Sequence, residues 1–598
     1  MILQALVHLY EELAKKGEVA REGWDKAKVS HRIMLSEKGE VEGIISAKTI
    51  VTQGKKQKEI PTGMWVPLPA VRSSGVKANF LCDNSSYIFG IDNKGNPERT
   101  KQCFKAAKEL HQKILQNCHS ETAQAILNFF NSWNPEKALE NPFVARNEED
   151  ILSASNFIFQ VNGQDAMEDE AICEAWRIYR EGNDKGESTA AMGQCLVTGK
   201  YHQKIEIVHN KIKGVVGAQS SGANLVSFNA QSFCSYGYDD EQGKNAPVGE
   251  PAASAYVKAL NYLLADSLHR KIMGDTTIVY WAEHAQSEYQ DCLSAIFGDN
   301  NVMSNMTLNA VMQKMREGKP AALDDIEISP NEPFYILGLA PNASRVSVRF
   351  FWKNTFGQTM RNLMAHQDRM KMKGPEWEKE NIPLWRTLKE TANPHSKDDA
   401  SSPLISGSLL RAVLSDDKYP EAVYQNIMMR IFSGKDEDAD SGKPAIYKIN
   451  HVKAAFIKAY LLKNGSRKWE GIIQMAVNKE TKEISYVLGR LFSVLENIQE
   501  RANPGINATI KDRYFNSACA TPAVTFPVLL KLSNAHLRKL DQGQAIYYSK
   551  MVQALMDKID MPDIGTPFPK RLSLEEQGAF VLGYYQETQA RYTKKEEQ

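Results

Sequence analysis

The chain has 598 residues, of which 42% are hydrophobic, 73 are Lys or Arg and 72 are Asp or Glu. This length supports large buried cores and more than one domain, and no apolar run approaches the ~20 residues that span a membrane. A net charge of +1 argues against a protein that coats nucleic acid, so any nucleic-acid site must be a local concentration of charge.

The N-terminus alternates apolar and polar residues at helical spacing over residues 1–16, with acids at Glu11 and Glu12. This pattern predicts a folded amphipathic helix rather than a signal peptide. The cysteines are scattered without a CxxC pair, which disfavours a zinc site or a disulfide framework. We therefore expect a cytoplasmic protein with reduced thiols at Cys82, Cys103, Cys118, Cys173, Cys195, Cys234, Cys292 and Cys519.

The first half of the chain reads as mixed helix and strand. Strands are predicted at residues 41–53, 157–163 and 204–215, a loop at 60–75 and a helix within 100–135. Residues 217–250 contain too many Gly, Ser and Asn for a regular element. A loop of this length in a compact domain is usually functional or disordered, and its interleaved aromatic residues argue for order.

The second half begins with a predicted helix at residues 251–272 and a buried strand at 275–283. Residues 335–352 are predicted to form two strands joined at Pro341 and Asn342. Helices follow, and the polar residues 375–403 are the best candidate for a linker. A second polar run at 434–444 interrupts the helices.

The C-terminal segment has the clearest pattern. A near-heptad apolar stripe over residues 484–498 predicts one long helix that ends at Pro504 and Gly505. Further helices are expected at about 511–518, 524–539, 543–560 and 573–592, which together suggest a helical bundle. The predicted class is therefore α+β, with a mixed α/β domain at 1–335, a basic hairpin and helical connecting region at 336–474, and a bundle at 475–598.

No catalytic signature is present. Residues 217–222 have the GxxxxG spacing of a phosphate loop, but Ala223 and Asn224 stand where Lys and Ser or Thr are needed. HExxH and GxSxG are absent. His209 could contact phosphate, but a structural or surface role is favoured. We predict no catalytic residue, metal or cofactor. One alternative is a metal-dependent nuclease or nucleic-acid-modifying enzyme whose acids and histidines come together only in the folded protein. Another alternative is a scaffold without nucleic-acid contacts.

Two polar segments have the chemistry of a nucleic-acid site. One loop combines cations, hydroxyls, an amide and a glycine, which suit phosphate oxygens, although an ordinary surface turn explains it as well: Arg72, Ser73, Ser74, Gly75, Lys77 and Asn79. The other segment has small and amide side chains that can read base edges, with an internally hydrogen-bonded loop as the equal alternative. Its candidate residues are Lys211, Lys213, Gln219, Ser220, Ser221, Asn224, Asn229, Gln231, Gln242, Lys244 and Asn245.

A third candidate region is basic and aromatic. Residues 345–373 contain seven cations and one acid, with interleaved aromatic residues, a composition that suits a nucleic-acid channel or a solvated basic face. We select Arg345, Arg349 and Lys353, and expect Arg345, Ser347 and Arg349 to share one strand face. The bundle helices carry Arg490, Arg513, Lys531, Arg538 and Lys539. Of these, Lys531 and Arg538 share one side of a helix and Lys539 is adjacent, so these three could hold a DNA strand or merely provide solubility.

Several stretches resemble the large subunit of the type I-C CRISPR surveillance complex, Cascade. They are RSSGVKANFLCDNSSYIFG, IKGVVGAQSSGANLVSFNAQSFCSYGYDDEQGKNAPVGEPAASAYVKALNYLL, LGLAPNASRVSVRFFW, INHVKAAFIKAYL and YVLGRLFSVLENIQERAN. The resemblance extends from about residue 20 to beyond residue 540.

The resemblance implies a non-catalytic antiviral protein that recognises the protospacer-adjacent motif in double-stranded target DNA, aids unwinding and holds the displaced strand. Base pairing to a guide RNA would read the remaining sequence. Its implied partners are a repeated backbone subunit, a guide-processing subunit, a helicase-nuclease and a small subunit translated separately from the C-terminal portion. Met475 would start such a product. We further expect the Arg72–Asn79 loop and the Gln219–Gln242 segment to converge on the motif duplex.

Overall fold

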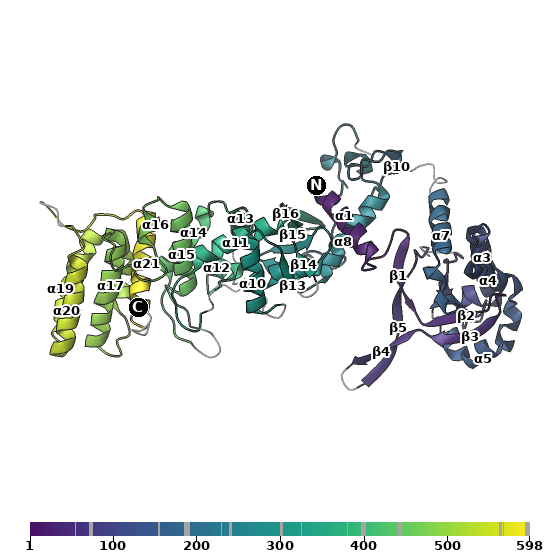
Figure 1. Cartoon of the computed structure of the whole chain (residues 1–598), viewed down its shortest axis with the longest axis horizontal. Coiled ribbons are helices and arrows are strands. Elements are labelled where there is room, and N and C mark those ends of the chain that lie inside the picture. The colour runs from purple at the N-terminus through teal and green to yellow at the C-terminus, as the bar shows by residue number, and fades with distance from the viewer. Residues whose placement is uncertain are drawn as a thin grey trace. The chain divides into compact units, whose positions relative to one another are not determined.

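The structure is a computed structural model that describes residues 1–53, 56–70, 76–153, 156–183, 192–228, 230–238, 242–298, 303–323, 326–378, 381–395, 402–439, 445–560, 565 and 567–592. The chain divides into two units, which Figure 1 shows with their elements labelled. Unit 1 comprises residues 1, 3–209 and 228–259, and unit 2 comprises residues 2, 210–227 and 260–598.

Unit 1 contains mixed helix and strand. Its helices, together with α8, whose last residues belong to unit 2, are α1 Ile2–Lys15, α2 Ser85–Ile88, α3 Pro97–Leu115, α4 Glu121–Ser132, α5 Pro142–Arg146, α6 Glu148–Leu152, α7 Glu170–Asn183 and α8 Glu250–Ala265. Its strands are β1 Trp24–Val29, β2 His31–Leu35, β3 Val41–Ser46, β4 Lys48–Gln53, β5 Lys56–Pro67, β6 Cys82–Asn84, β7 Asn156–Val161, β8 Gln164–Asp165, β9 Met192–Gly193 and β10 Gln203–Lys204. Short 3-10 helices span Pro135–Glu140, Ala166–Glu168, Gln231–Phe233 and Gln242–Asn245.

The core of unit 1 lies between a mixed sheet and its helices. The sheet has the order β3-β2-β7-β6, with β2 and β7 parallel and β8 paired to β7. Phe159 of β7 is buried against Phe129 and Phe130 of α4, and Phe157, on the same face of β7, packs against Phe89. The strands predicted at 41–53 and 157–163 are confirmed, whereas the helix predicted within 100–135 is divided into α3 and α4.

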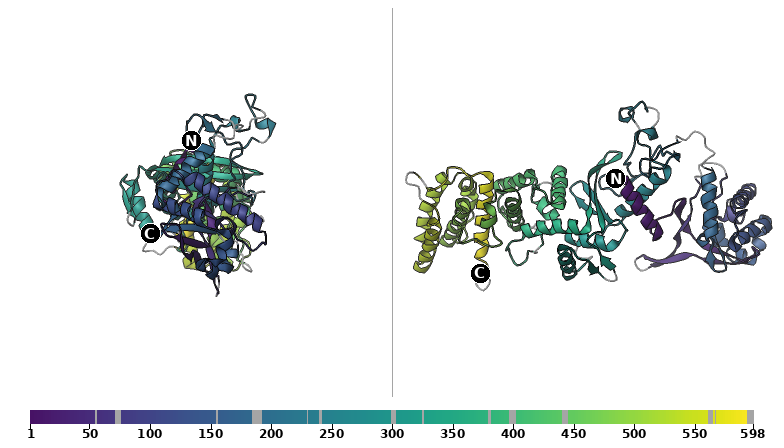
Figure 2. Two further views of the ribbon diagram at one scale, coloured as in Figure 1. Left: turned by 90° about the vertical axis from the view of Figure 1, so that its right-hand side faces the viewer. Right: turned by 45° about the horizontal axis from the view of Figure 1, so that its top comes forward.

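A second sheet of unit 1 corrects the loop predicted at 60–75, because β5 continues to Pro67. β5 pairs with β4 as far as Pro61 and with β1 from Thr62 onwards. Pro61 therefore lies at the end of the ladder with β4, where the strand changes partners and where a proline, which has no N–H to donate, is tolerated. The β4–β5 hairpin extends beyond the rest of unit 1 in Figure 1 and in the right view of Figure 2.

Unit 2 begins with a sheet and continues as helices. Its strands are β11 Lys271–Met273, β12 Thr276–Ala282, β13 Ala321–Leu323, β14 Ile326–Ile328, β15 Pro333–Asn342 and β16 Arg345–Thr355. Its helices are α9 Ser287–Ile296, α10 Asn305–Arg316, α11 Phe356–Met370, α12 Leu384–Lys389, α13 Pro403–Ser415, α14 Glu421–Ser433, α15 His451–Asn464, α16 Trp469–Ile472, α17 Ile484–Ala502, α18 Ile510–Ala520, α19 Pro522–Leu537, α20 Gln542–Met556 and α21 Leu574–Ala590.

The main sheet of unit 2 is antiparallel, in the order β11-β12-β15-β16. The buried strand predicted at 275–283 is confirmed as β12, whose residues are all buried. The hairpin predicted at 335–352 also forms, but β15 runs through Pro341 and Asn342 and the turn falls at Ala343 and Ser344. Ala343 has a φ of 52°, the left-handed conformation that a tight turn requires.

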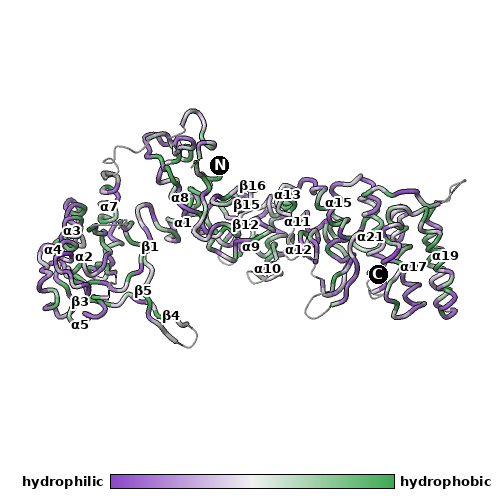
Figure 3. Tube along the Cα trace, turned by 180° about the vertical axis from the view of Figure 1, so that it is seen from behind, coloured by the Kyte–Doolittle hydropathy of each residue, from purple (hydrophilic) through white to green (hydrophobic). Residues whose placement is uncertain are grey.

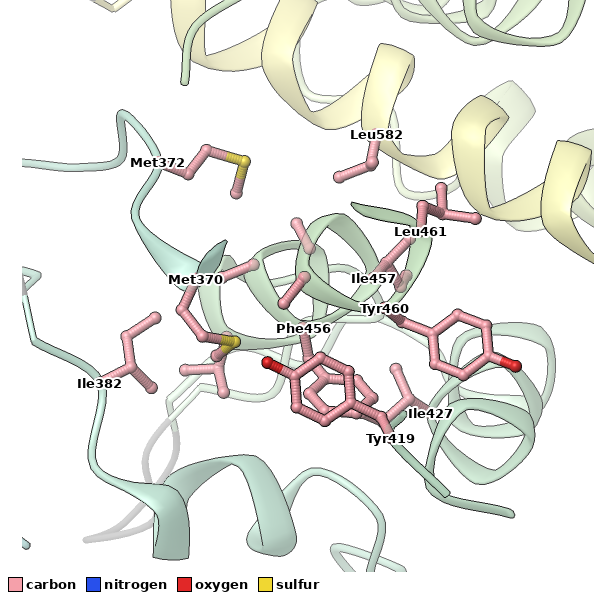
Figure 4. Packing of buried hydrophobic residues seen from close by; sticks show 14 of the residues in the cluster. Met370, Met372, Ile382, Tyr419, Ile427, Phe456, Ile457, Tyr460, Leu461 and Leu582 are labelled. Carbon is pink, nitrogen blue, oxygen red and sulfur yellow. The ribbon is translucent and has the colours of Figure 1, made fainter. Parts of the chain in front are cut away.

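Helix α15 is the centre of the helical part of unit 2, because all its residues from 451 to 461 are buried. Figure 4 shows Phe456, Ile457 and Leu461 of this helix among Tyr419 and Leu582 from other segments. Hydrophobic and hydrophilic residues alternate along the surrounding helices in Figure 3, as expected where one face of each helix meets the core. One contiguous hydrophobic cluster extends from Met273 to Tyr585.

The C-terminal helices agree with the sequence prediction. The apolar stripe lies on α17, and α18, α19, α20 and α21 follow within a few residues of the expected bounds. The predicted C-terminal domain is in contact with the connecting region before it. Helix α21 packs on α15, where the hydroxyl of Tyr585 and Nδ1 of His451 share a hydrogen bond of 3.0 Å. Whether residues 475–598 fold alone therefore stays a prediction, and the fold class is α+β as expected.

Two further expectations about local structure were wrong. Residues 204–215 form no continuous strand: only β10 and single bridges at Ile205 and Ile212 occur there. In the predicted linker at 375–403, α12 is ordered by Leu384 and Leu388, which are buried in the core, while residues 379–380 and 396–401 lie outside the described residues. Among the helices that the structure describes, none is long and apolar enough to cross a membrane.

Candidate nucleic-acid interface

The 210–224 loop of unit 2 is closed at a neck. Ile212 and Ala223 exchange two backbone hydrogen bonds of 2.9 Å, so that residues 213–222 form a bounded loop. Gly222 at the neck has a φ of 92°, and a Cβ there would lie 2.8 Å from the Cβ of Lys211. Only glycine fits this conformation and this close approach without displacement.

Asn261 on the last turns of α8 holds one side of this loop. Its Nδ2 donates to the carbonyl of Lys211 at 3.1 Å, and its Oδ1 accepts from the backbone N–H of Lys213 at 2.8 Å. One side-chain amide is therefore hydrogen-bonded to backbone groups on both sides of Ile212. Here the backbone groups of Lys211 and Lys213 pair with a side chain instead of with a neighbouring strand. The strand predicted at 204–215 therefore does not form in this segment.

The loop is also joined to the hairpin of the main sheet. The backbone N–H of Val216 donates to Thr277 Oγ1 on β12 at 3.0 Å. Asn224 donates from its backbone N–H to the carbonyl of Ser344 at 3.1 Å and accepts from the backbone N–H of Val346 at 3.0 Å. Residues that are more than 100 positions apart in the sequence thus form one surface, made of the 210–224 loop and the β15–β16 turn.

This surface is rich in donors and contains no acid. Residues 210–227 and 341–349 include neither Asp nor Glu. The exposed residues of the loop include Lys211, Lys213, Gln219, Ser220 and Ser221, whereas Asn224 and Arg345 are half-buried. Ammonium groups and hydroxyls suit phosphate oxygens, and the amide of Gln219 can pair with a base edge.

Arg349 and Lys353 lie further along β16, where a β-bulge separates them from Arg345. The register shifts opposite Gly338 and Leu339, at Arg349, so the alternation that Arg345 and Ser347 begin is interrupted there. Arg345 lies opposite Asn342 and Lys353 opposite Tyr335, which places these two cations on opposite faces of the sheet.

The cations after the bulge already have contacts within unit 2. Arg349 donates through Nη2 to Asp275 Oδ2 at 2.7 Å, and the ammonium of Lys353 lies 5.3 Å from the ring centroid of Tyr335. The expectation that Arg345, Ser347 and Arg349 share one uninterrupted face is therefore wrong. The extra residue of a bulge breaks the alternation of side chains between the two faces of a strand.

In unit 1, Asn79 closes the neck of the first candidate loop. Its Oδ1 accepts from the backbone N–H of Ala70 at 3.0 Å, and its own N–H donates to Asp83 Oδ2 at 2.8 Å. Lys77 is exposed, whereas Arg72, Ser73, Ser74 and Gly75 lie outside the described residues. The amide of Asn79 thus has a structural function in addition to any base contact.

The rest of the long polar segment also belongs to unit 1. Asn245 accepts from the N–H of Ser235 at 2.7 Å and donates to the carbonyl of Tyr238 at 3.1 Å. The ammonium of Lys244 lies 5.8 Å from the ring of Tyr238. Gln231 is exposed, Gln242 begins a short 3-10 helix, and Asn229 lies outside the described residues. Convergence of the Arg72–Asn79 loop with the Gln219–Gln242 segment stays a prediction.

The cations of the bundle have different environments. Lys531 and Arg538 on or after α19 are exposed, as is Arg513, and Lys539 donates to Asn503 Oδ1 at 2.8 Å. Arg490 is instead buried and paired with Glu587 at 2.7 Å. In the part of the chain that the structure describes, no group of three or more His, Cys, Asp or Glu side chains could hold a metal ion.

Comparison with known families gives one match. The model of a family described as CRISPR-associated protein (Cas_Csd1) matches residues 6–592. The chain belongs to the Cas_Csd1 family. No curated protein matches the chain in the corresponding search. For this Cas_Csd1 protein, the expected relation to CRISPR systems is confirmed.

The sequence analysis of this Cas_Csd1 chain missed two residues that shape the interface. Asn261 and Thr277 carry no candidate chemistry by themselves, and each holds a backbone segment from another part of the chain. A signal was present for Asn261, because it is a polar residue within the apolar pattern ALNYLLA. A buried or half-buried amide in such a helix usually has a backbone partner.

Proposed function

We propose that this chain is the non-catalytic large subunit of a type I-C surveillance complex, in which it recognises the protospacer-adjacent motif in duplex DNA. In this proposal it also aids unwinding, stabilises the opened duplex and provides a docking surface for a helicase-nuclease. The guide RNA, the repeated backbone subunit, the guide-processing subunit and a separately translated small subunit are its partners. The family match over residues 6–592 supports the assignment to a CRISPR system.

The observation that carries the DNA-binding part is the acid-free surface of the 210–224 loop and the β15–β16 turn. The side chains of Asn261 and Thr277 and the carbonyl of Ser344 accept hydrogen bonds from its backbone N–H groups and hold it in place. The exposed side chains are therefore presented on a fixed support, which reduces the entropy lost when they bind. Cations would neutralise phosphates, and the amide of Gln219 would read a base edge.

The test uses the complex reassembled with guide RNA and a matched duplex that carries either the motif or a scrambled motif. Replacing Lys211 and Lys213 together with Ala should weaken binding to both duplexes and lower the slope of log affinity against log salt by roughly 2 units. Gln219→Ala should instead reduce the preference for the motif, by ~1–3 kcal/mol if a direct base contact is lost.

Lys418→Ala is the matched control, because Lys418 is an exposed lysine of the same unit outside this surface. Its affinity, motif preference and salt slope should equal those of the unsubstituted protein. If the loop variants behave like this control, the surface does not contact DNA and the proposal loses its structural support.

A further inference from the structure

One face of the β1–β5 ladder in unit 1 carries two cations and an indole ring. Residues that lie opposite each other in an antiparallel ladder share a face, and so do residues two apart along a strand. Lys26 lies opposite Trp65, and Lys28 lies opposite Gly63. These four residues, which we call the Trp65 face, are all exposed. The two strands that carry them, β1 and β5, are labelled in Figure 1.

The opposite face of the same two strands meets the core of unit 1. Val66 is buried, and Met64 packs against the hydrophobic cluster that contains Val29 and Ile158. Because side chains alternate between the two faces of a strand, the Trp65 face is directed away from this cluster.

Gly63 brings a cation next to the indole. A Cβ at Gly63 would lie 2.7 Å from Cε of Lys26, so the Lys26 side chain lies across the position that a larger residue would fill. The ammonium of Lys26 is 5.4 Å from the centroid of the Trp65 ring, within the range of a cation–π contact. A phosphate bound at this ammonium would therefore have its base beside the ring.

The charge of the Trp65 face is set by Lys26 and Lys28. Asp25 lies on the opposite face by alternation, and its Oδ1 accepts from the backbone N–H of Lys26 at 2.7 Å. Glu59 shares the face but precedes Gly63 by four residues, which is roughly 13 Å along an extended strand. Lys26 and Lys28 are roughly 7 Å apart along β1 and can meet successive phosphates.

The ring itself is accessible, since Trp65 is 36% exposed. Cations beside an exposed aromatic ring form the combination that binds single-stranded nucleic acid, because phosphates meet the cations while bases stack on the ring. In a duplex the faces of the bases are already stacked on one another. The Trp65 face therefore suits an unpaired strand.

The chemistry of the face favours DNA of variable sequence. Its four residues include no side-chain amide or hydroxyl, the groups that would read a base edge or a ribose 2′-OH. Stacking and phosphate contacts tolerate any sequence. In the proposed function the displaced DNA strand changes with every target, whereas a guide RNA offers a 2′-OH at each nucleotide for a dedicated site to recognise.

We propose that the Trp65 face binds the displaced DNA strand, with one base stacked on Trp65 and successive phosphates at Lys26 and Lys28. This inference deepens the proposed function, on which it rests, because it assigns the opened strand to a specific surface of unit 1.

The first test measures binding of a fluorescein-labelled dT oligonucleotide of about 12 nucleotides to the full-length chain. Replacing Lys26 and Lys28 together with Gln should lower the affinity at least about tenfold and reduce the slope of log affinity against log salt by roughly 1.4 units. Trp65→Ala should lower the affinity about 5- to 150-fold, and Trp65→Phe should recover most of this loss, because stacking needs an aromatic ring.

Two controls match these variants. Ile60→Ala removes an exposed apolar side chain from the opposite face of β5, and Lys38→Gln removes an exposed cation from the turn after β2. Both should bind the oligonucleotide like the unsubstituted chain. Lys28→Gln alone guards against misfolding, since it should retain the thermal unfolding temperature and still weaken binding.

The second test identifies the strand in the reassembled complex on a matched target. One sample carries 5-iododeoxyuridine in the displaced DNA strand and the other carries 5-iodouridine in the guide RNA. Irradiation should crosslink the displaced strand to the peptide that contains Trp65, and Trp65→Ala should abolish this crosslink. A crosslink from the guide alone, or from neither strand, would overturn the assignment.

Equal oligonucleotide affinity and salt slope in every variant of the Trp65 face would also overturn the inference. Failure of the proposed function is a different result, since the unsubstituted complex would then not prefer duplexes that carry the motif. Single-strand affinity and motif preference therefore separate the two failures.

Discussion

The guanidinium of Arg490 donates through Nε to Glu587 Oε2 at 2.7 Å, and the two side chains are only 8% and 9% exposed. This ion pair joins α17 to α21, and Arg490 also donates through Nη1 to the carbonyl of Asn478 at 3.0 Å. Removing one partner of a buried pair leaves an uncompensated charge, whereas replacing both with apolar groups can be nearly neutral.

We therefore expect Arg490→Met to destabilise unit 2 by about 3–5 kcal/mol. The double variant with Glu587→Leu should recover most of this loss, and Arg513→Met, at an exposed position, should have little effect. The difference in free energy of unfolding between the variants is measured by denaturant unfolding, monitored through the C-terminal helices. A double variant as unstable as Arg490→Met alone would contradict the ion-pair argument.

Helices α17 and α21 approach each other closely through two glycines. A Cβ at Gly489 would lie 2.0 Å from the carbonyl oxygen of Phe580, and a Cβ at Gly583 would lie 2.2 Å from that of Tyr486. Gly489→Ala or Gly583→Ala should each cost at least about 1–3 kcal/mol, because backbone must move apart. Gly471→Ala is the control, since nothing lies within 4 Å of its Cβ position. Equal melting temperatures for the three variants would show that the helices separate without cost.

His111 should make unit 1 sensitive to acid. Its Nδ1 donates to the carbonyl of Ala107 at 2.7 Å, and its Nε2 accepts from the N–H of Leu81 at 3.1 Å, which requires the neutral imidazole. Burial lowers the pKa of His111 to about 4. Because the folded-state pKa lies below the unfolded value of about 6.5, this stability is complete above about pH 6.5 and is lost as the pH falls towards 4.

The loss should reach about 2 kcal/mol at pH 5. In urea unfolding, the stability difference between the unsubstituted protein and His111→Gln should therefore shrink by about this amount between pH 7.5 and pH 5. The His8→Gln variant, at a position that is only partly buried, provides the baseline. A difference that does not change with pH would mean that His111 is not held neutral.

The cations after the bulge of β16 should act on the DNA backbone rather than on bases. Replacing Arg349 and Lys353 together with Ala is expected to lower the slope of log affinity against log salt by roughly 1–2 units. Asp275 competes for Arg349 through their 2.7 Å contact, so Asp275→Asn should strengthen binding at low salt. An unchanged slope and full affinity in the double variant would exclude contact.

A separate small product should start at Met475, and the piece from Met475 to Gln598 has 598 − 475 + 1 = 124 residues. Met475 is 47% exposed and its carbonyl accepts from the N–H of Lys373 at 2.8 Å, so Met475→Leu should leave the full-length chain intact. A gel of the expressed complex should lose its short C-terminal band, while Met551→Leu should keep it. Persistence of the band in Met475→Leu would place the start elsewhere.

If the band is lost, target binding shows what the separate product does. We expect weaker retention of the opened duplex, because Lys531 and Arg538 would be present in fewer copies. Undiminished binding would mean that the separate bundle is dispensable for holding DNA.

Local sequence patterns predicted those helices and strands whose buried face follows directly from the spacing of their apolar residues. The stripe on residues 484–498 forms α17, and the apolar run at 275–283 forms β12, because each segment must bury the face that its period creates. The polar segment at 217–250 is irregular as expected, since its composition supports neither period.

Composition and motifs by themselves determined that the chain is α+β and that its C-terminal part is helical; that its polar and basic segments bind nucleic acid stays a prediction. Only the tertiary structure decided that Pro61 lies within a strand, that Arg490 is buried with Glu587, and that Asn224 meets Ser344 and Val346. The physical reason is the same in all three cases: the partner that satisfies the backbone or the charge is distant in the sequence, so no local pattern contains it.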